Sequence, residues 1–106
     1  MDEALRERIK ATIESHRVVL FMKGNKNFPQ CGFSAQTVAA LRASGAGFHA
    51  VNILADADLR SGLKEYSNWP TFPQLYVDGQ LVGGCDIVTS LNESGELKTL
   101  LAGSPS

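Results

Sequence analysis

Residues 18–22 read VVLFM, five consecutive apolar side chains within a chain of 106 residues. Successive side chains of a β-strand point to opposite faces of the sheet, so a short unbroken run of β-forming apolar residues predicts a strand buried on both faces. Such a strand belongs inside a sheet that is covered on both sides. The run therefore favours a layered α/β domain in which this strand is central.

Helices are predicted on both sides of this strand. Residues 1–15 place Leu5, Ile9 and Ile13 on one helical face, and Asp2 is suited to cap the start of this helix. The later helices are expected over residues 33–44 with Val38 and Leu41 inward, 56–66 capped by Asp56 or Asp58, and 86–94 and 96–103 hinged at Gly95.

Three further strands complete the predicted sheet. Residues 48–53 follow the second helix and should run parallel to the first strand after a right-handed crossover. Residues 71–77 and 80–84 flank an Asp-Gly pair, which is typical of a tight hairpin turn. We expect this hairpin to add two strands antiparallel to the first pair. The predicted α/β fold is a single domain over residues 1–106, a four-stranded mixed sheet with helices on both faces, with a flexible tail at 103–106.

Charge and hydropathy exclude several classes of function. The net charge is −1, so no basic face for nucleic acid is expected, and no apolar run approaches the roughly 20 residues that cross a bilayer. The first ten residues carry charges of both signs and resemble neither a signal peptide nor a transit peptide. We expect a cytoplasmic chain, or an organellar one whose transit peptide was removed. Its two cysteines are then more typical of catalysis, metal binding or an inert thiol than of a structural disulfide.

Cys31 is the candidate reactive residue. It lies between the loop 24–30 and a predicted helix, where unpaired N–H groups and the helix dipole lower the pKa of a thiol. Lys23 should add a second positive charge, and the small Gly32 lets another molecule approach the sulfur. Ser34 stands where a Cys-x-x-Cys motif has its second thiol, so this chain has no resolving cysteine there. The alternative is that Cys31 is a buried, unreactive thiol.

A second candidate site is the stretch GGCD at residues 83–86. Gly83 and Gly84 leave backbone exposed for a ligand, and the following helix start can hold a carboxylate. The Asp86 side chain is suited to pair with an ammonium group, although a helix N-cap explains it equally well. Cys85 alternatively packs as a small apolar side chain at the start of this helix.

Pro73 lies where the third predicted helix meets the third predicted strand. A cis bond before Pro73 would leave the backbone of Phe72 unpaired and open to a ligand, although only about 5–6% of X-Pro bonds are cis. His16 and His49 have no partner at the spacing of metal ligands, so we interpret both as structural or surface groups.

Four strings in order, FMKG, CGFS, WPTFPQLYVDG and GGCD, resemble the monothiol glutaredoxins of the Cys-Gly-Phe-Ser type. The resemblance extends from about Glu3 to Leu101 and implies a thioredoxin-like fold, in agreement with the element order predicted above. It also implies that Cys31 is both the reactive thiol and a ligand of a [2Fe–2S] cluster. The glutathione contacts that it implies are Lys23 and Arg60 for the glycine carboxylate, Thr71, Phe72 and Pro73 for the cysteinyl amide, and Cys85 and Asp86 for the γ-glutamyl end.

The function implied by the resemblance is cluster transfer or assembly and redox homeostasis. In the family, one cysteine and one glutathione from each of two subunits supply the four thiolates of the cluster. The resemblance therefore implies a homodimer as the holo form, with a BolA-like protein and apo iron–sulfur proteins as further partners. The resemblance also implies that dithiol enzymes of the superfamily have a shorter connection than the loop 24–30, and a longer loop is expected to disfavour fast thiol transfer. The main alternative is a glutathione-dependent oxidoreductase that deglutathionylates protein thiols.

Other interpretations stay open at this point. Arg60 is alternatively a solvated charge on a helix surface, and the whole chain is alternatively a thioredoxin-like interaction module with an inert thiol. If the GGCD turn lies near Cys31, oxidation of the glutathione-free protein is expected to close a strained Cys31–Cys85 disulfide that is readily reduced.

Overall fold

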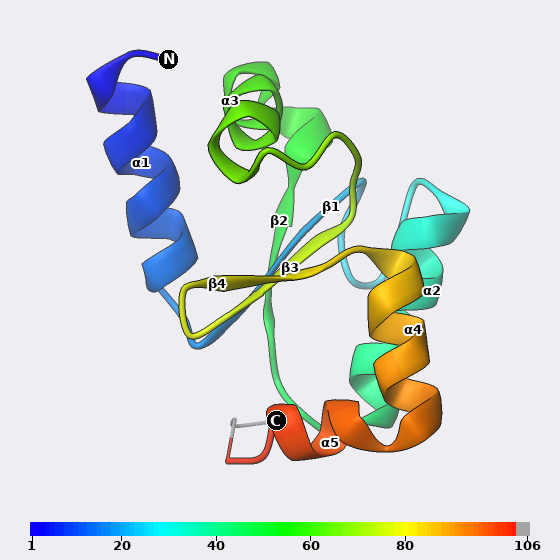
Figure 1. The fold of residues 1–106 in the computed structure, drawn as a ribbon. Coiled ribbons are helices and arrows are strands. Elements are labelled where there is room, and N and C mark those ends of the chain that lie inside the picture. Colours follow the sequence, from blue (N-terminus) through cyan, green and yellow to red (C-terminus); the bar gives the residue numbers. More distant parts are fainter. Residues whose placement is uncertain (104–106) are drawn as a thin grey trace.

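The fold was analysed in a computed structural model that describes residues 1–103. The order of helices and strands matches the predicted order (Figure 1). None of the helices within residues 1–103 combines the length and apolarity needed to cross a membrane. Most of the expected tail, residues 104–106, lies outside the described residues. The elements are α1 (Glu3–Glu14), β1 (Val18–Met22), α2 (Gly32–Ala43), β2 (His49–Asn52), the short 3-10 helix η1 (Ile53–Ala55), α3 (Ala57–Ser67), β3 (Gln74–Val77), β4 (Gln80–Gly83), α4 (Cys85–Ser94) and α5 (Glu96–Leu100).

The four strands form one mixed sheet in the order β2-β1-β3-β4. β1 pairs in parallel with β2 and antiparallel with β3, and all five of its residues are buried, as the apolar run predicts. The expectation that both hairpin strands run antiparallel to the first pair is wrong for β4. Because a hairpin reverses the chain, β4 is antiparallel to β3 and therefore runs in the direction of β1.

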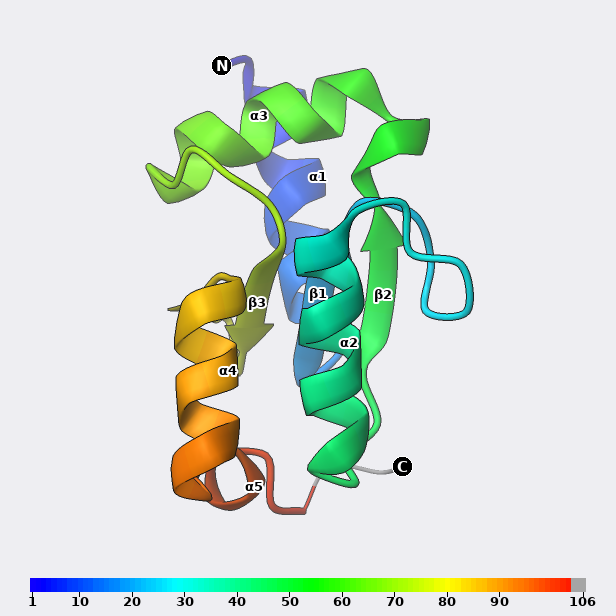
Figure 2. The same ribbon diagram turned by 90° about the vertical axis from the view of Figure 1, so that its right-hand side faces the viewer.

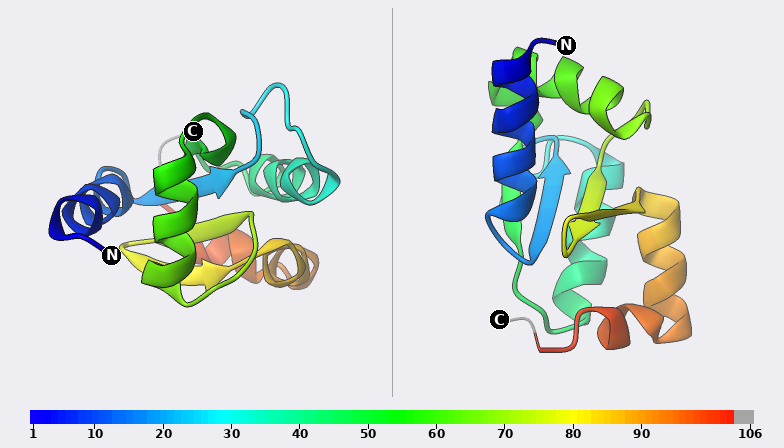
Figure 3. Two further views of the ribbon diagram at one scale, coloured as in Figure 1. Left: turned by 90° about the horizontal axis from the view of Figure 1, so that it is seen from above. Right: turned by 60° about the vertical axis from the view of Figure 1, so that its left-hand side comes forward.

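Helices cover both faces of the sheet and divide the core in two, which confirms the predicted α/β arrangement. In Figure 2, α2 and α4 lie side by side in front of the sheet, and Figure 3 shows α1 on the opposite side. Val18, Leu20 and Met22 of β1 face the first group of helices, whereas Val19 and Phe21 face the second. On the first side the buried apolar residues are Val38, Ala40, Leu41, Val88, Leu97 and, just after α5, Leu101; on the second side the helices supply Ile9, Ile13, Ile53, Leu59 and Leu63.

The starts of α1 and α3 and the end of α4 follow the predicted capping chemistry. The carboxylate of Asp2 accepts a hydrogen bond from the Leu5 N–H at 2.7 Å, and that of Asp56 accepts one from the Leu59 N–H at 3.0 Å. Asp56 rather than Asp58 is therefore the cap of α3. Gly95 ends α4 in the left-handed region, with φ of 83°, and so forms the expected hinge before α5.

Two strands are shorter than predicted because side chains take over their backbone partners. β2 ends at Asn52, whose Oδ1 accepts hydrogen bonds from the Leu54 N–H and the Gly24 N–H, both at 2.9 Å, and η1 starts there. β3 begins at Gln74 rather than at residue 71, since the preceding carbonyls bond to the Gln74 side chain instead of to a neighbouring strand. The predicted last strand also ends one residue earlier, at Gly83.

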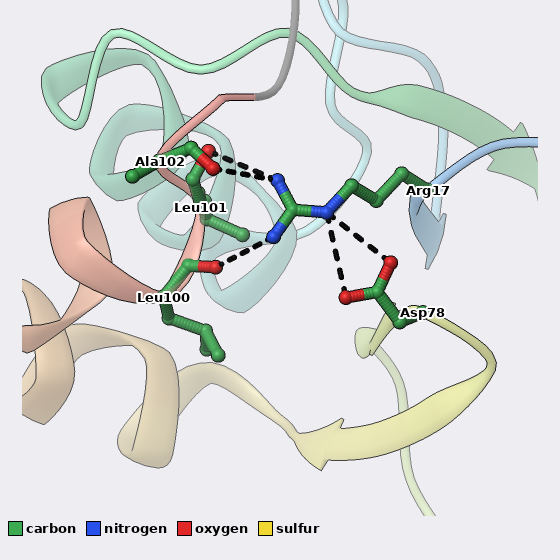
Figure 4. Close-up of polar contacts among 5 residues, drawn as sticks. All are labelled: Arg17, Asp78, Leu100, Leu101 and Ala102. Carbon is green, nitrogen blue, oxygen red and sulfur yellow. Dashed lines mark hydrogen bonds and ion pairs between the residues drawn. The ribbon is translucent and has the colours of Figure 1, made fainter.

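Arg17 joins three distant parts of the chain (Figure 4). Its guanidinium donates hydrogen bonds to the carbonyls of Leu100 at 3.1 Å, Leu101 at 3.4 Å and Ala102 at 2.9 Å. Its Nε lies 3.2 Å from Oδ1 of Asp78, in the turn between β3 and β4. The planar guanidinium of Arg17 thus donates hydrogen bonds to carbonyls at the end of α5, which accept no hydrogen bond from within the helix.

Replacing Arg17 by Lys should lower the free energy of unfolding by about 1–2 kcal/mol. A lysine keeps the charge but cannot reach several carbonyls and a carboxylate at once, and each exposed bond is worth little alone. Urea denaturation of the variant measures the change. The same substitution at Arg6, an exposed residue of α1, serves as the control, and equal stability losses for both variants would contradict the role of Arg17.

Candidate functional site

A cleft of about 420 Å³ opens between the end of β1, α3, the segment before β3 and the start of α4. It collects all seven of the residues that sequence analysis assigned to glutathione, and it adds others that were not predicted, among them Lys64 and Trp69. The lining residues are Lys23, Phe33, Arg60, Lys64, Trp69, Pro70, Thr71, Phe72, Pro73, Gly84, Cys85, Asp86 and Ile87.

Cys31 is positioned beside this cleft as the N-cap of α2, next to the lining residue Phe33. Its Sγ accepts a hydrogen bond from the Ser34 N–H at 3.4 Å and lies 3.7 Å from the Ser34 hydroxyl. The position above Gly32 is open, since a Cβ there would meet nothing within 4 Å. The sulfur is half-buried, so the interpretation of Cys31 as a fully buried thiol is wrong.

The environment of Cys31 favours the thiolate. Burial by itself raises the pKa of the thiol, but hydrogen bonds from the backbone and hydroxyl of Ser34 and from the backbone of Phe33, together with the charge of Lys23, outweigh it. The net result is a pKa below the ordinary value of cysteine. This confirms the predicted effect of the helix start and of Lys23.

Ser34 does more than replace a second thiol. Its side chain is fully buried, and its Oγ accepts a hydrogen bond from the Lys23 N–H at 3.1 Å. The hydroxyl hydrogen stays available for the sulfur of Cys31. Ser34 therefore ties the end of β1 to the start of α2 and at the same time stabilises the thiolate.

Replacing Ser34 by Ala should move the pKa of Cys31 upward. The backbone N–H bond to the sulfur remains in this variant, but the hydroxyl bond is lost. Because alkylating agents react with the thiolate, the rate of Cys31 alkylation should reach half of its plateau at a higher pH than in the wild type. Mass spectrometry of iodoacetamide-treated protein across pH measures this, with Ser90→Ala on α4 as the control. An unchanged midpoint for Ser34→Ala would refute the role of the hydroxyl.

One wall of the cleft is cationic. Lys23 comes from the end of β1, while Arg60 and Lys64 lie one turn apart on α3. Within residues 1–103, none of these three side chains forms an ion pair, so their charges are available to an anionic ligand. Sequence analysis missed Lys64, although its spacing of four residues from Arg60 places it on the same helical face.

The opposite wall is the first turn of α4. Gly84, not Asp86, is the N-cap, and no side chain caps the helix, so the predicted capping role of Asp86 is wrong. Asp86 is the exposed second residue of the helix, where a carboxylate faces the cleft and complements the helix dipole. Gly83 is buried and does not line the cleft; its φ of 148° and the nearby Ile87 side chain leave no space for a Cβ.

The third wall is the segment from Trp69 to Pro73. The Phe72–Pro73 peptide bond is cis, which is the rare isomer that sequence analysis considered as a way to leave the Phe72 backbone open to a ligand. Gly84 approaches this segment so closely that a Cβ on it would lie 3.1 Å from the Pro73 carbonyl oxygen and 3.5 Å from Nε1 of Trp69. A glycine at position 84 therefore allows the start of α4 to pack against the cis-proline segment.

No cluster of three or more metal-ligating side chains occurs among residues 1–103. His16 and His49 stack with ring centroids 4.1 Å apart, and their interpretation as structural or surface groups stays a prediction. Burial, followed by the charges of His16 and Lys26, lowers the pKa of His49. Both cysteines are free, and the proposed Cys31–Cys85 disulfide stays a prediction.

The loop 24–30 is held to its surroundings rather than projecting freely. Gly24 and Pro29 form a β-bridge, and the amine of Lys26 donates to the carbonyl of Phe48 at the edge of the sheet. Figure 2 shows the loop beside β2. Loop residues 25–28 and the first two residues of β2, His49 and Ala50, line a shared pocket, so the loop lies against the start of this edge strand.

Comparisons with known proteins agree with this geometry. Residues 18–82 match the family model for glutaredoxin. A probable monothiol glutaredoxin of Rickettsia conorii is 55% identical over 88% of the chain and 87% of its own length. The chain belongs to the monothiol glutaredoxin family. A monothiol glutaredoxin of rice, Oryza sativa subsp. japonica, is 56% identical over 94% of the chain, which spans only 20% of the rice protein.

Solved structures confirm the thioredoxin-like glutaredoxin fold. The solution structure of a reduced apo glutaredoxin from poplar superimposes with a TM-score of 0.76. It is 56% identical in sequence, and the match covers 90% of this chain and 87% of the poplar chain. The four-stranded mixed sheet with helices on both faces is therefore the glutaredoxin architecture.

Proposed function

We propose that the cleft binds glutathione and that the Cys31 thiolate, together with the thiolate of the bound glutathione, holds a [2Fe–2S] cluster as transferable cargo. The observation that carries this proposal is the placement of seven predicted contact residues around one cleft beside a thiol of lowered pKa. Membership of the monothiol glutaredoxin family supports it.

The walls of the cleft match the functional groups of glutathione. The glycine carboxylate pairs with Lys23 and Arg60, and Lys64 adds a third cation on this wall. The backbone of Phe72, beside Thr71 and Pro73, pairs with the cysteinyl amide as an added strand would.

The γ-glutamyl end has both of its charges matched at the start of α4. Its carboxylate accepts hydrogen bonds from the N–H groups of Cys85 and Asp86, and its ammonium group pairs with the Asp86 carboxylate. Opposite charges at the two ends of the cleft thus fix one orientation of the tripeptide, with its thiol toward Cys31.

The chain alone offers too few ligands for a cluster. A [2Fe–2S] cluster takes four thiolates, whereas the described residues contain no cluster of metal ligands and only Cys31 is placed at the open helix start. Two chains and two glutathione molecules supply the required four. A cluster held half by an exchangeable small molecule suits delivery to apo iron–sulfur proteins.

Anaerobic reconstitution with iron and sulfide tests this proposal directly. The visible absorbance of a [2Fe–2S] cluster should develop with glutathione present and should be absent without it. Glutathione-independent cluster formation would reject the shared ligand set. A BolA-like partner and a cytoplasmic location remain predictions that need separate experiments.

Cluster binding should convert monomers into two-fold symmetric dimers. The rim of one small cleft is too small to hold two chains together without the bridging cluster. Light scattering of apo and reconstituted samples at equal concentration should give masses of one chain and two chains, respectively. An identical mass for the two forms would rule out a cluster shared between subunits.

The lowered pKa of Cys31 also supports a second function, deglutathionylation of protein thiols. The Cys31 thiolate would attack the glutathione sulfur of a mixed disulfide and release the protein thiolate, which takes up a proton. A second glutathione thiolate would then attack the Cys31–glutathione disulfide, freeing Cys31 and forming glutathione disulfide. A mixed-disulfide reductase assay measures this activity independently of any cluster.

A further inference from the structure

Gln74, the first residue of β3, is a fully buried polar side chain that lies outside the cleft. Its Nε2 donates hydrogen bonds to the carbonyls of Trp69 at 3.1 Å and Thr71 at 3.3 Å. Its Oε1 accepts a hydrogen bond from the Tyr76 hydroxyl at 3.2 Å. Both the NH₂ group and the carbonyl oxygen of this buried amide are therefore hydrogen-bonded, and all of the partners lie within residues 69–76.

The two carbonyls that Gln74 binds belong to the wall of the cleft. Trp69 and Thr71 both line it, and the residues between and after them, Pro70 and Phe72, do so as well. These residues precede β3 and are outside any helix or strand, so no regular backbone ladder holds them. The Gln74 amide takes the place of such a ladder.

Tyr76 fixes the orientation of the Gln74 amide. The phenol ring is buried and packs edge-on against Phe21 with centroids 5.6 Å apart. Burial raises the pKa of Tyr76 to about 12, so the hydroxyl stays protonated and donates a hydrogen bond to Oε1 of Gln74. With Oε1 committed to this donor, the NH₂ group of Gln74 must point toward the two carbonyls.

We propose that Gln74 is a positioning residue of the binding site, which holds the Trp69–Phe72 wall in the geometry that the ligand requires. Gln74 touches no ligand itself; it acts through the carbonyls of Trp69 and Thr71. The inference rests on the proposed binding of glutathione for its ligand, and its structural part is open to a separate test.

The experiment uses Gln74→Met, which keeps the length of the side chain and removes both kinds of hydrogen bond. Glutathione affinity, measured by calorimetric titration, should fall by roughly tenfold, since the wall must be ordered upon binding. Trp69 is the single tryptophan of the chain, so its indole N–H gives one resonance in a ¹⁵N-correlated spectrum. That resonance should shift and broaden in Gln74→Met. The same change at Gln80, an exposed residue of β4, should alter neither measurement.

A second variant keeps the test decisive if Gln74→Met fails to fold. In Gln74→Glu, an ionised carboxylate offers no donor to the two carbonyls, whereas a protonated carboxyl donates to one of them. The glutathione affinity of Gln74→Glu relative to wild type should therefore recover as the pH is lowered. If Gln74 only fills space in the core, the affinity of Gln74→Glu relative to wild type should not depend on pH.

Two results would overturn the inference. One is wild-type affinity in Gln74→Met with an unmoved Trp69 resonance, and the other is a pH-independent affinity ratio for Gln74→Glu. If wild-type protein itself does not bind glutathione, the proposed function fails, and the Trp69 resonance alone then decides whether Gln74 positions the wall.

Discussion

Cys31→Ser should abolish binding of the [2Fe–2S] cluster completely. A serine hydroxyl does not replace a thiolate as a ligand at neutral pH, and the described residues hold no cluster of alternative ligands. Reconstitution of this variant with iron, sulfide and glutathione should leave no cluster absorbance in the visible spectrum. The fold should be retained, because Cys31 is half-buried and serine is a favourable N-cap residue for α2.

Cys85→Ser is the matched control for this loss. The side chain of Cys85 is buried at the start of α4, and the proposal assigns only its backbone N–H to the ligand. This variant should keep most of the cluster absorbance. A full cluster spectrum in Cys31→Ser, or an equal loss in both variants, would show that the ligands have been assigned wrongly.

Lys23→Ala and Arg60→Ala should each weaken glutathione binding by about 10- to 100-fold. The estimate corresponds to roughly 1.5–3 kcal/mol for a hydrogen bond to a charged group, and solvent screening moves the half-exposed Arg60 toward the lower value. Both side chains line the cleft without an ion-pair partner within residues 1–103, so removing either one leaves no carboxylate of the protein unpaired. Calorimetric titration with glutathione gives the affinity.

Exposed charges on α1 provide the controls for these two variants. Lys10→Ala and Arg6→Ala remove the same charges from a helix that does not line the cleft. They should leave the affinity unchanged in low salt as well as high salt, whereas the cleft variants should lose most of their salt dependence. If all four variants bind equally well, Lys23 and Arg60 are only solvated surface charges.

The core and the cysteine environment could be predicted because short-range rules govern them. The run at 18–22 identifies the central strand from its unbroken apolarity, and Asp2 and the Asp-Gly turn act through neighbours in sequence. The position of Cys31 before a helix was sufficient to predict the direction of its pKa shift.

The parts that could not be predicted depend on contacts between segments distant in sequence. The amide of Asn52 ends β2 early because it also binds Gly24 from another element. Asp86 fits an N-cap by type, but Gly84 is the N-cap and α4 begins at Cys85, one residue earlier than predicted. Gly84 packs close to Pro73, a contact that the sequence does not reveal. Sequence analysis assigned no role to Gln74, and only the folded path of residues 69–71 brings two carbonyls to its amide.

The hydrogen bonds from Arg17 to the carbonyls of residues 100–102 also bear on when the chain can finish folding during synthesis. Arg17 and Ala102 are 85 positions apart, and Leu97 and Leu101 belong to the core beside β1. A ribosome makes the chain from its N-terminus, so β1 and Arg17 emerge long before these partners do. A nascent chain halted before Leu97 lacks the last part of this core, although α2 and α4 already supply Val38, Leu41 and Val88 to it. We therefore expect native structure to form only once α5 has cleared the exit tunnel, with chaperones shielding the incomplete core until then.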